Sequence, residues 1–313
     1  MRWLWIIPCA LLVSCANPAK KAPEELQDDT WISFDGKMMP WQSWNVPQGQ
    51  KTHAALIAIH GLSGATSDFW PLGEHLSKQG IAVYAYELRG QGHDPDVAAR
   101  GDIESARLWQ KDLTTFHKLI QRRHPRAPII WYGESLGSLI AAHTAANRPL
   151  WGDPDGLILA SPAAGLRMRV QGIQRWLLEA AAAVAPRTRY SLGQLAGVDE
   201  NSIQVTSNTT HGTQMTKTPH HINAFTLRLL VEIDQMMNAN PEAAKRLKMP
   251  VLFIASPHDI IASADQIQAW FSQIRAEPKK LLWYSRSYHL LLHDVQRQEV
   301  LKDVERWLSS ISR

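Results

Sequence analysis

The feature that most constrains the fold is the alternation of short, almost wholly apolar segments with longer segments of helical period. Strands that are apolar on both faces are covered on both sides, and strands separated by helices usually run parallel. The predicted buried strands are Ala54–His60, Ile81–Leu88, Pro128–Tyr132, Gly156–Ala160, Pro250–Ser256 and Lys280–Ser285. The predicted helices are Ser67–Gln79, Glu104–His124, Leu136–Asn147, Ala264–Arg275 and Val295–Ile311. The pattern therefore predicts an α/β fold, a mostly parallel sheet with helices on both faces.

Two further segments extend this plan. Trp31–Phe34 and Met39–Val46 flank the turn Asp35-Gly36 and are predicted to form a leading antiparallel pair. Residues 164–248 contain no clear strand, but Gln171–Ala185 and Asn223–Met237 have helical patterns. Because a structureless loop of this size would be unusual, we interpret it as a helical cap inserted into a core of residues 31–163 and 249–313. A separate domain is the weaker interpretation, since strands resume at residue 250.

A G-x-S-x-G motif lies where a predicted strand ends and a predicted helix begins. The motif is Gly133-Glu134-Ser135-Leu136-Gly137. A sharp turn between strand and helix exposes the serine hydroxyl at the sheet edge, and glycines on either side avoid collisions in that turn. The motif alone often occurs by chance, but this context indicates that Ser135 is a nucleophile.

A serine hydroxyl needs a base to take its proton and a carboxylate to orient that base. On this type of sheet the expected chain order is serine, acid, histidine. Asp259 follows the strand Pro250–Ser256, and His289 follows Lys280–Ser285. Both residues are thus expected at the edge where Ser135 emerges, and the three are our candidate catalytic residues.

Other interpretations of these residues stay open. Asp259 could instead be a solvated loop acid or cap the helix that starts at Ala264. His293, four residues after His289, is a competing base, although His289 follows its strand immediately. His258 precedes the acid and is expected to lie on the surface.

Acyl transfer also requires donors for the developing oxyanion. His60-Gly61-Leu62-Ser63-Gly64 follows the first central strand, and Leu136 follows the nucleophile. We predict the backbone N–H groups of Leu62 and Leu136 as these donors. His60 is expected to bond its own loop rather than to act as a base.

The N-terminus predicts export. Met1–Ser14 has one early charge, Arg2, followed by an apolar run that is too short to span a bilayer, as in a secretory signal peptide. Leu12-Val13-Ser14-Cys15 resembles the bacterial lipoprotein lipobox, which implies cleavage before Cys15 and lipidation of its thiol. Residues 15–30 would be the lipidated tether. Since Ala16 follows Cys15, the expected home is the outer membrane of a bacterial envelope, facing the periplasm; a plain signal peptide is the alternative.

The charged residues give little indication of a partner. The net charge is +4, and no basic run exceeds two or three residues, so the sequence does not predict nucleic-acid binding. The histidines lack the spacing of metal ligands, and we predict neither a metal nor a cofactor. The oligomeric state is not indicated.

Several of these motifs occur together in a known family. The chain resembles the α/β-hydrolases of the monoacylglycerol lipase or lysophospholipase type, which are also classed with the serine aminopeptidase S33 domain. The residues that carry the resemblance are Asp35-Gly36, His60-Gly61, Leu88-Arg89-Gly90-Gln91-Gly92-His93, Gly133–Gly137, Asp259 and Tyr288-His289. It implies an eight-stranded core, a helical cap and a triad of Ser135, His289 and Asp259. Two positions depart from it, because relatives usually have Asp where Glu87 stands and often Glu where Leu290 stands.

The resemblance implies a serine hydrolase of carboxylic esters, with lipid-like monoesters as substrates. Trp176-Leu177-Leu178 could give the cap an apolar lip, although cap helices usually pack on the core. An S33-type aminopeptidase is the alternative, and it would need an anion for the substrate amine, such as Glu232 or Asp234. A non-catalytic envelope lipoprotein on a hydrolase scaffold is a third interpretation, which the intact motifs disfavour.

Overall fold

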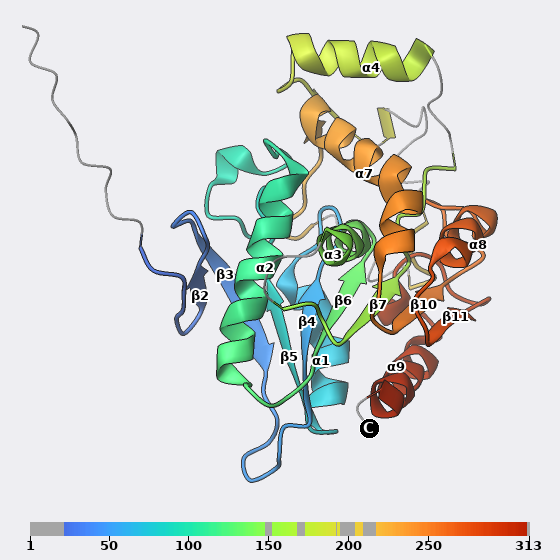
Figure 1. Ribbon diagram of the computed structural model, residues 1–313. Coiled ribbons are helices and arrows are strands. Elements are labelled where there is room, and N and C mark those ends of the chain that lie inside the picture. Colours follow the sequence, from blue (N-terminus) through green and yellow to red (C-terminus); the bar gives the residue numbers. More distant parts are fainter. Residues whose placement is uncertain are drawn as a thin grey trace, which may run out of the picture.

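The computed structural model describes residues 22–147, 152–167, 173–191, 193–194, 204–208 and 217–311. Its centre is a twisted sheet with helices on both faces (Figure 1). Among the described residues the sheet has nine strands, in the order β1-β2-β3-β5-β4-β6-β7-β10-β11. The strands are β1 (Glu25–Leu26), β2 (Thr30–Ile32), β3 (Met38–Trp44), β4 (Ala54–Ile59), β5 (Ile81–Tyr86), β6 (Ile129–Glu134), β7 (Gly156–Ala160), β10 (Val251–Ala255) and β11 (Lys279–Trp283).

The pairing of the strands explains why their functional ends meet. Strands β4, β5, β6, β7, β10 and β11 all run parallel to one another, and antiparallel pairings join β1 to β2, β2 to β3 and β3 to β5. Every residue of β4, β5, β6, β7 and β10 is buried, as expected of strands covered on both faces. The loops after the parallel strands therefore gather at one edge of the sheet.

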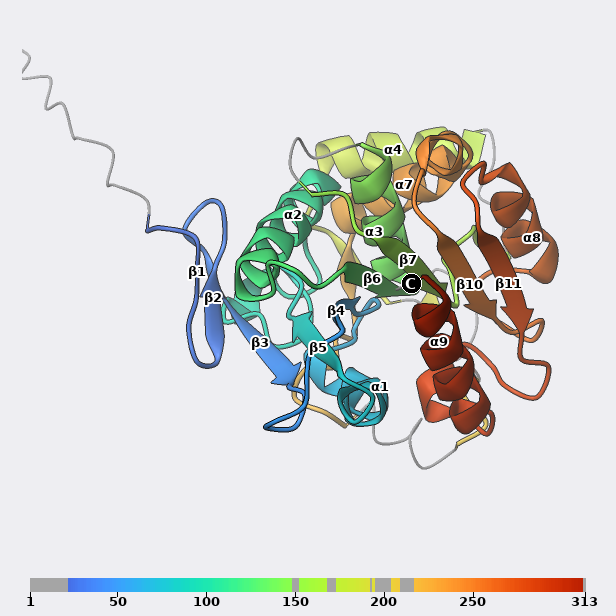
Figure 2. The same cartoon turned by 60° about the horizontal axis from the view of Figure 1, so that its bottom comes forward.

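The helices form one layer on each face. Helices α1 (Trp70–Ser77) and α9 (Arg297–Ile311) cover one face, and α2 (Ala106–Arg123), α3 (Leu136–Ala146) and α8 (Ala264–Gln273) cover the other (Figure 2). The buried side chains divide in the same way. One apolar cluster joins the sheet to α2, α3 and α8, and the other joins it to α1 and α9.

The described parts of residues 164–248 lie over the edge at which the parallel strands end, as a cap above α3 (Figure 1). Their described elements are α4 (Ile173–Val184), β8 (Arg189–Tyr190), β9 (Phe225–Thr226) and α7 (Leu227–Arg246). The two predicted helices are present, but the absence of strands was wrong, because β8 and β9 form a small antiparallel pair. Helix α7 also continues past the predicted end, through Pro241.

The sheet has one strand more than the eight that the family resemblance implies. The extra strand is β1, which pairs with β2 through Glu25 and Leu26. Those residues lie in the segment 15–30, which we expected to be the lipidated tether. A two-residue strand has no alternating pattern that a sequence could reveal, and its partner Trp31 supplies the buried surface against which it forms.

Candidate active site

Ser135 occupies a sharp turn between β6 and α3. It is the N-cap residue of α3, with φ of 53° and ψ of −114°, a left-handed conformation that a residue with a side chain adopts only when its surroundings impose it. Its backbone N–H donates to the carbonyl of Ala160 at the end of β7, at 3.0 Å. The strand, turn and helix that the motif predicts are thus all present.

Both motif glycines are required by close contacts. A Cβ on Gly133 would overlap the Gly137 carbonyl, and a Cβ on Gly137 would overlap the carbonyl of Ile59 in β4. The absence of these two side chains lets α3 start directly above the sheet. The backbone on either side of Ser135 is therefore fixed by close packing, of Gly133 against α3 and of Gly137 against β4.

Asp259 lies in the loop between β10 and α8, fully buried. Its Oδ1 accepts the backbone N–H groups of Ile261 at 2.8 Å and Ala262 at 3.3 Å. The alternative of a cap for α8 is wrong, because the hydroxyl of Ser263 caps that helix by accepting the Gln266 N–H. The second oxygen, Oδ2, remains for another partner.

That partner is His289, whose Nδ1 lies 2.7 Å from Oδ2 of Asp259. The carboxylate accepts the Nδ1 proton, which leaves Nε2 of the ring with a lone pair. Burial opposes the charged imidazole, but Asp259 and Glu134 together raise the pKa of His289. A hydrogen bond from the Ser161 hydroxyl to the His289 carbonyl anchors this residue at the end of β7, next to the Ala160 carbonyl that holds Ser135.

The competing histidines lie elsewhere. Nε2 of His293 donates to the carbonyl of Asp68 at 2.8 Å, so its ring is turned toward the start of α1. His258 is exposed, as expected, with its ring near that of Tyr288. Of the three candidate histidines, His289 is thus the one that contacts Asp259.

The loop after β4 lies directly beside the serine. A Cβ added to Gly61 would come 3.2 Å from Cβ of Ser135, a tight contact that would push the loop and the serine slightly apart. The Gly64 N–H donates to the Gly61 carbonyl at 3.1 Å and closes a tight turn around Leu62. Leu136 is the first residue of α3, so the helix provides no acceptor for its N–H. The two predicted donors therefore flank the serine. The ring of His60, as expected, bonds its own loop, with Nδ1 2.9 Å from the Gly61 carbonyl.

Glu134, the residue before the serine, has an unusual charge state. Burial and the neighbouring Asp68 carboxylate raise the pKa of Glu134 to about 7, although His289 and His60 act in the opposite direction. The sequence analysis assigned no role to this side chain. It is a titratable group that acts electrostatically on His289 near neutral pH.

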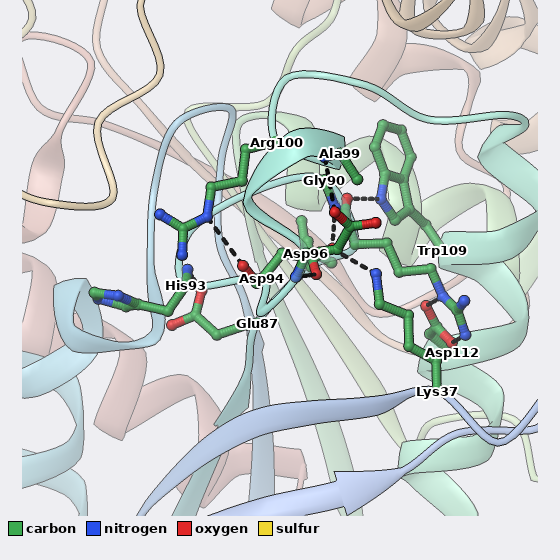
Figure 3. Close-up of polar contacts among 12 residues, drawn as sticks. Lys37, Glu87, Gly90, His93, Asp94, Asp96, Ala99, Arg100, Trp109 and Asp112 are labelled. Atoms are coloured by element: carbon green, nitrogen blue, oxygen red, sulfur yellow. Dashed lines mark hydrogen bonds and ion pairs between the residues drawn. The ribbon is translucent and has the colours of Figure 1, made fainter.

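The turn after β5 is a second ordered loop at this edge (Figure 3). Its central side chain is the buried carboxylate of Asp94, which accepts the Gly90 N–H and the Lys37 ammonium, each at 2.7 Å, and the Asp96 N–H at 2.9 Å. Arg100 donates from Nε to the Asp94 carbonyl at 3.0 Å. Sequence reasoning missed Asp94, whose contacts depend on residues far apart in the chain.

This turn also holds the cap. Arg228 at the start of α7 forms a two-pronged ion pair with Asp102, which additionally accepts the Thr226 hydroxyl at 2.7 Å. On the other side, the Ile222 N–H donates to the Ser63 hydroxyl at 2.9 Å. The cap is therefore fastened both to the turn after β5 and to the loop that carries Leu62.

The two acids considered for binding a substrate amine have other partners. Glu232 accepts the N–H of Ala106, the first residue of α2, at 2.7 Å. Asp234 is 3.2 Å from Nε of Arg175 and lines a hollow of about 540 Å³ between α7 and α8, whose described lining includes none of the three triad candidates. Neither acid is arranged to receive an amine beside Ser135.

Helix α4 turns apolar side chains outward. Trp176 is 61% exposed, Leu177 is 54% exposed and Val184 is 88% exposed. These side chains do not pack on the core, which was the alternative considered for this segment. The cap therefore carries an apolar outer face.

Some expectations fall outside these observations. The signal peptide, Cys15 and most of the tether lie outside the described residues. Within the part of the chain that the structure describes, no cluster of His, Cys, Asp or Glu is arranged to hold a metal ion. In the same part, no helix is both long enough and apolar enough to span a bilayer.

The chain is similar in sequence and in structure to known hydrolases. Residues 50–296 match the model of the family described as serine aminopeptidase, S33. The monoglyceride lipase of Rattus norvegicus is 23% identical over 294 residues, covering 89% of each chain, and the monoacylglycerol lipase of Mycolicibacterium smegmatis is 21% identical over 82% of this chain and 88% of its own. Among solved structures, a soluble variant of the monoglyceride lipase from Saccharomyces cerevisiae superimposes with a TM-score of 0.76, at 18% identity over 93% of this chain and 100% of its own. A carboxyl esterase from Bacillus coagulans gives a TM-score of 0.78, at 19% identity over 92% and 99%. The fold is that of the α/β-hydrolases.

Proposed function

Because the chain belongs to the serine aminopeptidase S33 family of α/β-hydrolases, we propose that this serine carboxylic ester hydrolase cleaves lipid-like monoesters, such as monoacylglycerols or lysophospholipids. The observation that carries the proposal is the hydrogen bond between His289 and a buried Asp259 at the strand edge where the turn of Ser135 lies. The lipase and esterase relatives support the ester class of substrate.

The proposed mechanism follows from this arrangement. Asp259 holds the proton on Nδ1, so that Nε2 of His289 accepts the proton of Ser135 as the hydroxyl oxygen attacks the ester carbonyl. The N–H groups of Leu62 and Leu136 stabilise the resulting oxyanion. The imidazolium then protonates the leaving alcohol, which departs and leaves an acyl-enzyme. Water, deprotonated by the same ring, hydrolyses that intermediate and releases the fatty acid.

The preference for lipids is supported by the cap. Exposed Trp176 and Leu177 would suit a protein that meets its substrate at an apolar surface, and a lipid anchor on Cys15 would keep it there. The aminopeptidase alternative has no comparable support, since Glu232 and Asp234 are engaged elsewhere.

The enzyme proposal is tested with a fluorophosphonate probe, which labels activated serines. The protein should be labelled, and Ser135→Ala should lose labelling and esterase activity together. Ser272→Ala removes an exposed hydroxyl of α8 and serves as the matched control, which should keep both labelling and activity. A native protein that resists labelling would favour a non-catalytic scaffold.

The substrate class is tested with a series of monoacylglycerols of increasing chain length beside aminoacyl amides. We expect kcat/KM to be highest for an acyl ester longer than butyrate. A higher kcat/KM for the amides would overturn the lipase proposal in favour of the peptidase.

We further propose that Cys15 carries the lipid anchor in the bacterial outer membrane, facing the periplasm. Expression with a labelled fatty acid should give a labelled protein in the membrane fraction. Cys15→Ser should abolish both the label and the membrane association. Label retained by Cys15→Ser would show that the anchor lies elsewhere.

A further inference from the structure

The loop of residues 61–66, here called the oxyanion loop, has a shape that its own sequence does not favour. Ser63 has φ of 58°, in the left-handed region that a residue with a side chain seldom adopts. Gly61 lies against Ser135, and the amide of Leu62 lies between Gly61 and Ser63 in the chain. A loop of this kind keeps its form only when surrounding groups hold it.

One buried carboxylate contacts both ends of the oxyanion loop. Glu87, which follows β5 and is 1% exposed, accepts from Thr66 through Oε1, at 3.0 Å from the backbone N–H and 2.9 Å from the hydroxyl. Its Oε2 lies 3.4 Å from Nε2 of His60, the residue just before the loop. The same oxygen accepts the N–H of His93 at 3.1 Å, and Figure 3 shows the two residues side by side.

The turn after β5 is shaped to receive this side chain. Gly92 has φ of 51°, and a Cβ there would overlap Oε2 of Glu87, so the carboxylate occupies the space that glycine leaves. The neighbouring Gln91 supplies a further contact, since its Oε1 accepts the Ser63 N–H at 2.9 Å. The ring of His60 is held by Leu88, whose N–H donates to Nε2 at 3.0 Å. The middle and both ends of the oxyanion loop are therefore bonded to the segment of residues 87–91.

Glu87 is also charged throughout the working range of a hydrolase. Burial by itself would raise the pKa of this carboxyl, but His60 and the amides of Thr66 and His93 lower it to about 2. Hydrogen bonds to an ionised acceptor are roughly twice as strong as neutral ones. The contacts at Thr66 and His93 are thus of the stronger kind.

We propose that Glu87 is a positioning residue that holds the oxyanion loop in the form in which the Leu62 amide stabilises the tetrahedral intermediate. Glu87 does not touch the substrate, and its effect passes through the backbone of the loop. The inference rests on the proposed ester hydrolysis. It gives a role to a position at which this chain departs from the pattern of its relatives.

The defining variant is Glu87→Gln, which keeps the size of the side chain but removes its charge and one acceptor. Loosening a donor that acts mainly on the transition state lowers kcat and leaves ground-state binding almost unchanged. We expect kcat for a p-nitrophenyl ester to fall roughly tenfold, a fraction of the loss expected for a missing oxyanion donor, and KM to change less than about twofold. A boronic acid, which forms a tetrahedral adduct with the serine, should bind weaker by the factor lost in kcat/KM, whereas a non-reactive ether analogue should bind as before.

Controls separate positioning from stability. Glu74→Gln changes an exposed acid of α1 and should keep the wild-type kcat. Glu87→Asp keeps the charge but is one methylene shorter, and its kcat should lie between those of the wild type and Glu87→Gln. A wild-type kcat in folded Glu87→Gln overturns the inference, and so does a boronate affinity that stays unchanged while kcat falls.

Two results, an unfolded Glu87→Gln and an inactive wild type, are handled separately. If Glu87→Gln does not fold, Thr66→Val decides, because it removes one donor to Glu87 and leaves the carboxylate in place. A several-fold loss of kcat in Thr66→Val supports the inference, and an unchanged kcat overturns it. If the wild type cleaves no ester at all, the proposed function fails first, and that result is distinct from an active wild type with an insensitive Glu87.

Discussion

Replacing Asp259 with asparagine should change the tautomer of His289 rather than its position. Oδ1 of Asp259 accepts two backbone N–H groups, those of Ile261 and Ala262. In Asp259→Asn the amide oxygen must stay at this place to keep those bonds, which puts the NH₂ group where Oδ2 now faces Nδ1 of His289. Nδ1 then becomes an acceptor, Nε2 carries the proton, and the ring can no longer take a proton from Ser135.

The size of the effect follows from the loss of the base. When a triad keeps its geometry but has the wrong tautomer, kcat falls about 10⁴-fold, which corresponds to about 5.5 kcal/mol of transition-state stabilisation at 1.36 kcal/mol per factor of ten. Because asparagine matches aspartate in shape and keeps the bonds at Oδ1, the free energy of unfolding should change by less than about 1 kcal/mol.

The assay is steady-state hydrolysis of a p-nitrophenyl ester, with thermal melting of the same samples. Asp265→Asn, on the exposed first turn of α8, is the matched control and should keep its activity within about twofold of the wild type. A folded Asp259→Asn that retains more than a tenth of the wild-type kcat would refute the assignment of Asp259 as the group that orients His289.

Three other predictions follow from the charged groups. The pKa of His289 is raised by Asp259 and Glu134, and the base must be neutral, so kcat/KM should rise with pH through that pKa. In Glu134→Gln this rise on the acid side of the pH profile should move to lower pH. A rise at the same pH in the variant would exclude the influence of Glu134. The pKa of Glu87 is about 2 in the folded protein and near 4.5 in the unfolded chain, so its charge contributes about 3 kcal/mol of stability above pH 4.5, which is lost as pH falls to 2. Acid unfolding of Glu87→Gln should lack this contribution. Identical acid unfolding curves for the two proteins would contradict it. Arg89→Met leaves the buried Asp112 without its cation and should cost about 3–5 kcal/mol, measured as the shift of the urea midpoint; a shift equivalent to less than about 1 kcal/mol would show that the Asp112 charge is compensated elsewhere.

The sequence was sufficient to place the candidate triad on the sheet. Ser135, Asp259 and His289 each follow an apolar run, and parallel strands bring such positions to one edge whatever the details of packing. The contact between His289 and Asp259 has the geometry expected of them. The choice between His289 and His293 needed the structure, because both lie within five residues of chain, and the direction of each ring depends on packing.

What could not be predicted depends on contacts between distant segments. Glu87 was visible only as a departure from the family pattern, since its role requires Thr66 and Gly92, which lie in other turns. Helix α7 was predicted to end at Met237 but continues to Arg246. The buried side chain of Asn240 bonds His143 and the Ala163 carbonyl, and this packing holds the helix through the proline that follows.

The pairing of Asp102 with Arg228 has a consequence for engineering the enzyme. The cap is not an independent module that can be exchanged along its chain boundaries, because its anchoring acid belongs to the turn after β5. A chimera that receives a foreign lid between residues 164 and 248 should keep its activity only if residues 90–102 are transplanted with it. Grafting that turn as well would preserve the contact between the lid and the loops at the sheet edge, and with it the alignment of the candidate catalytic residues.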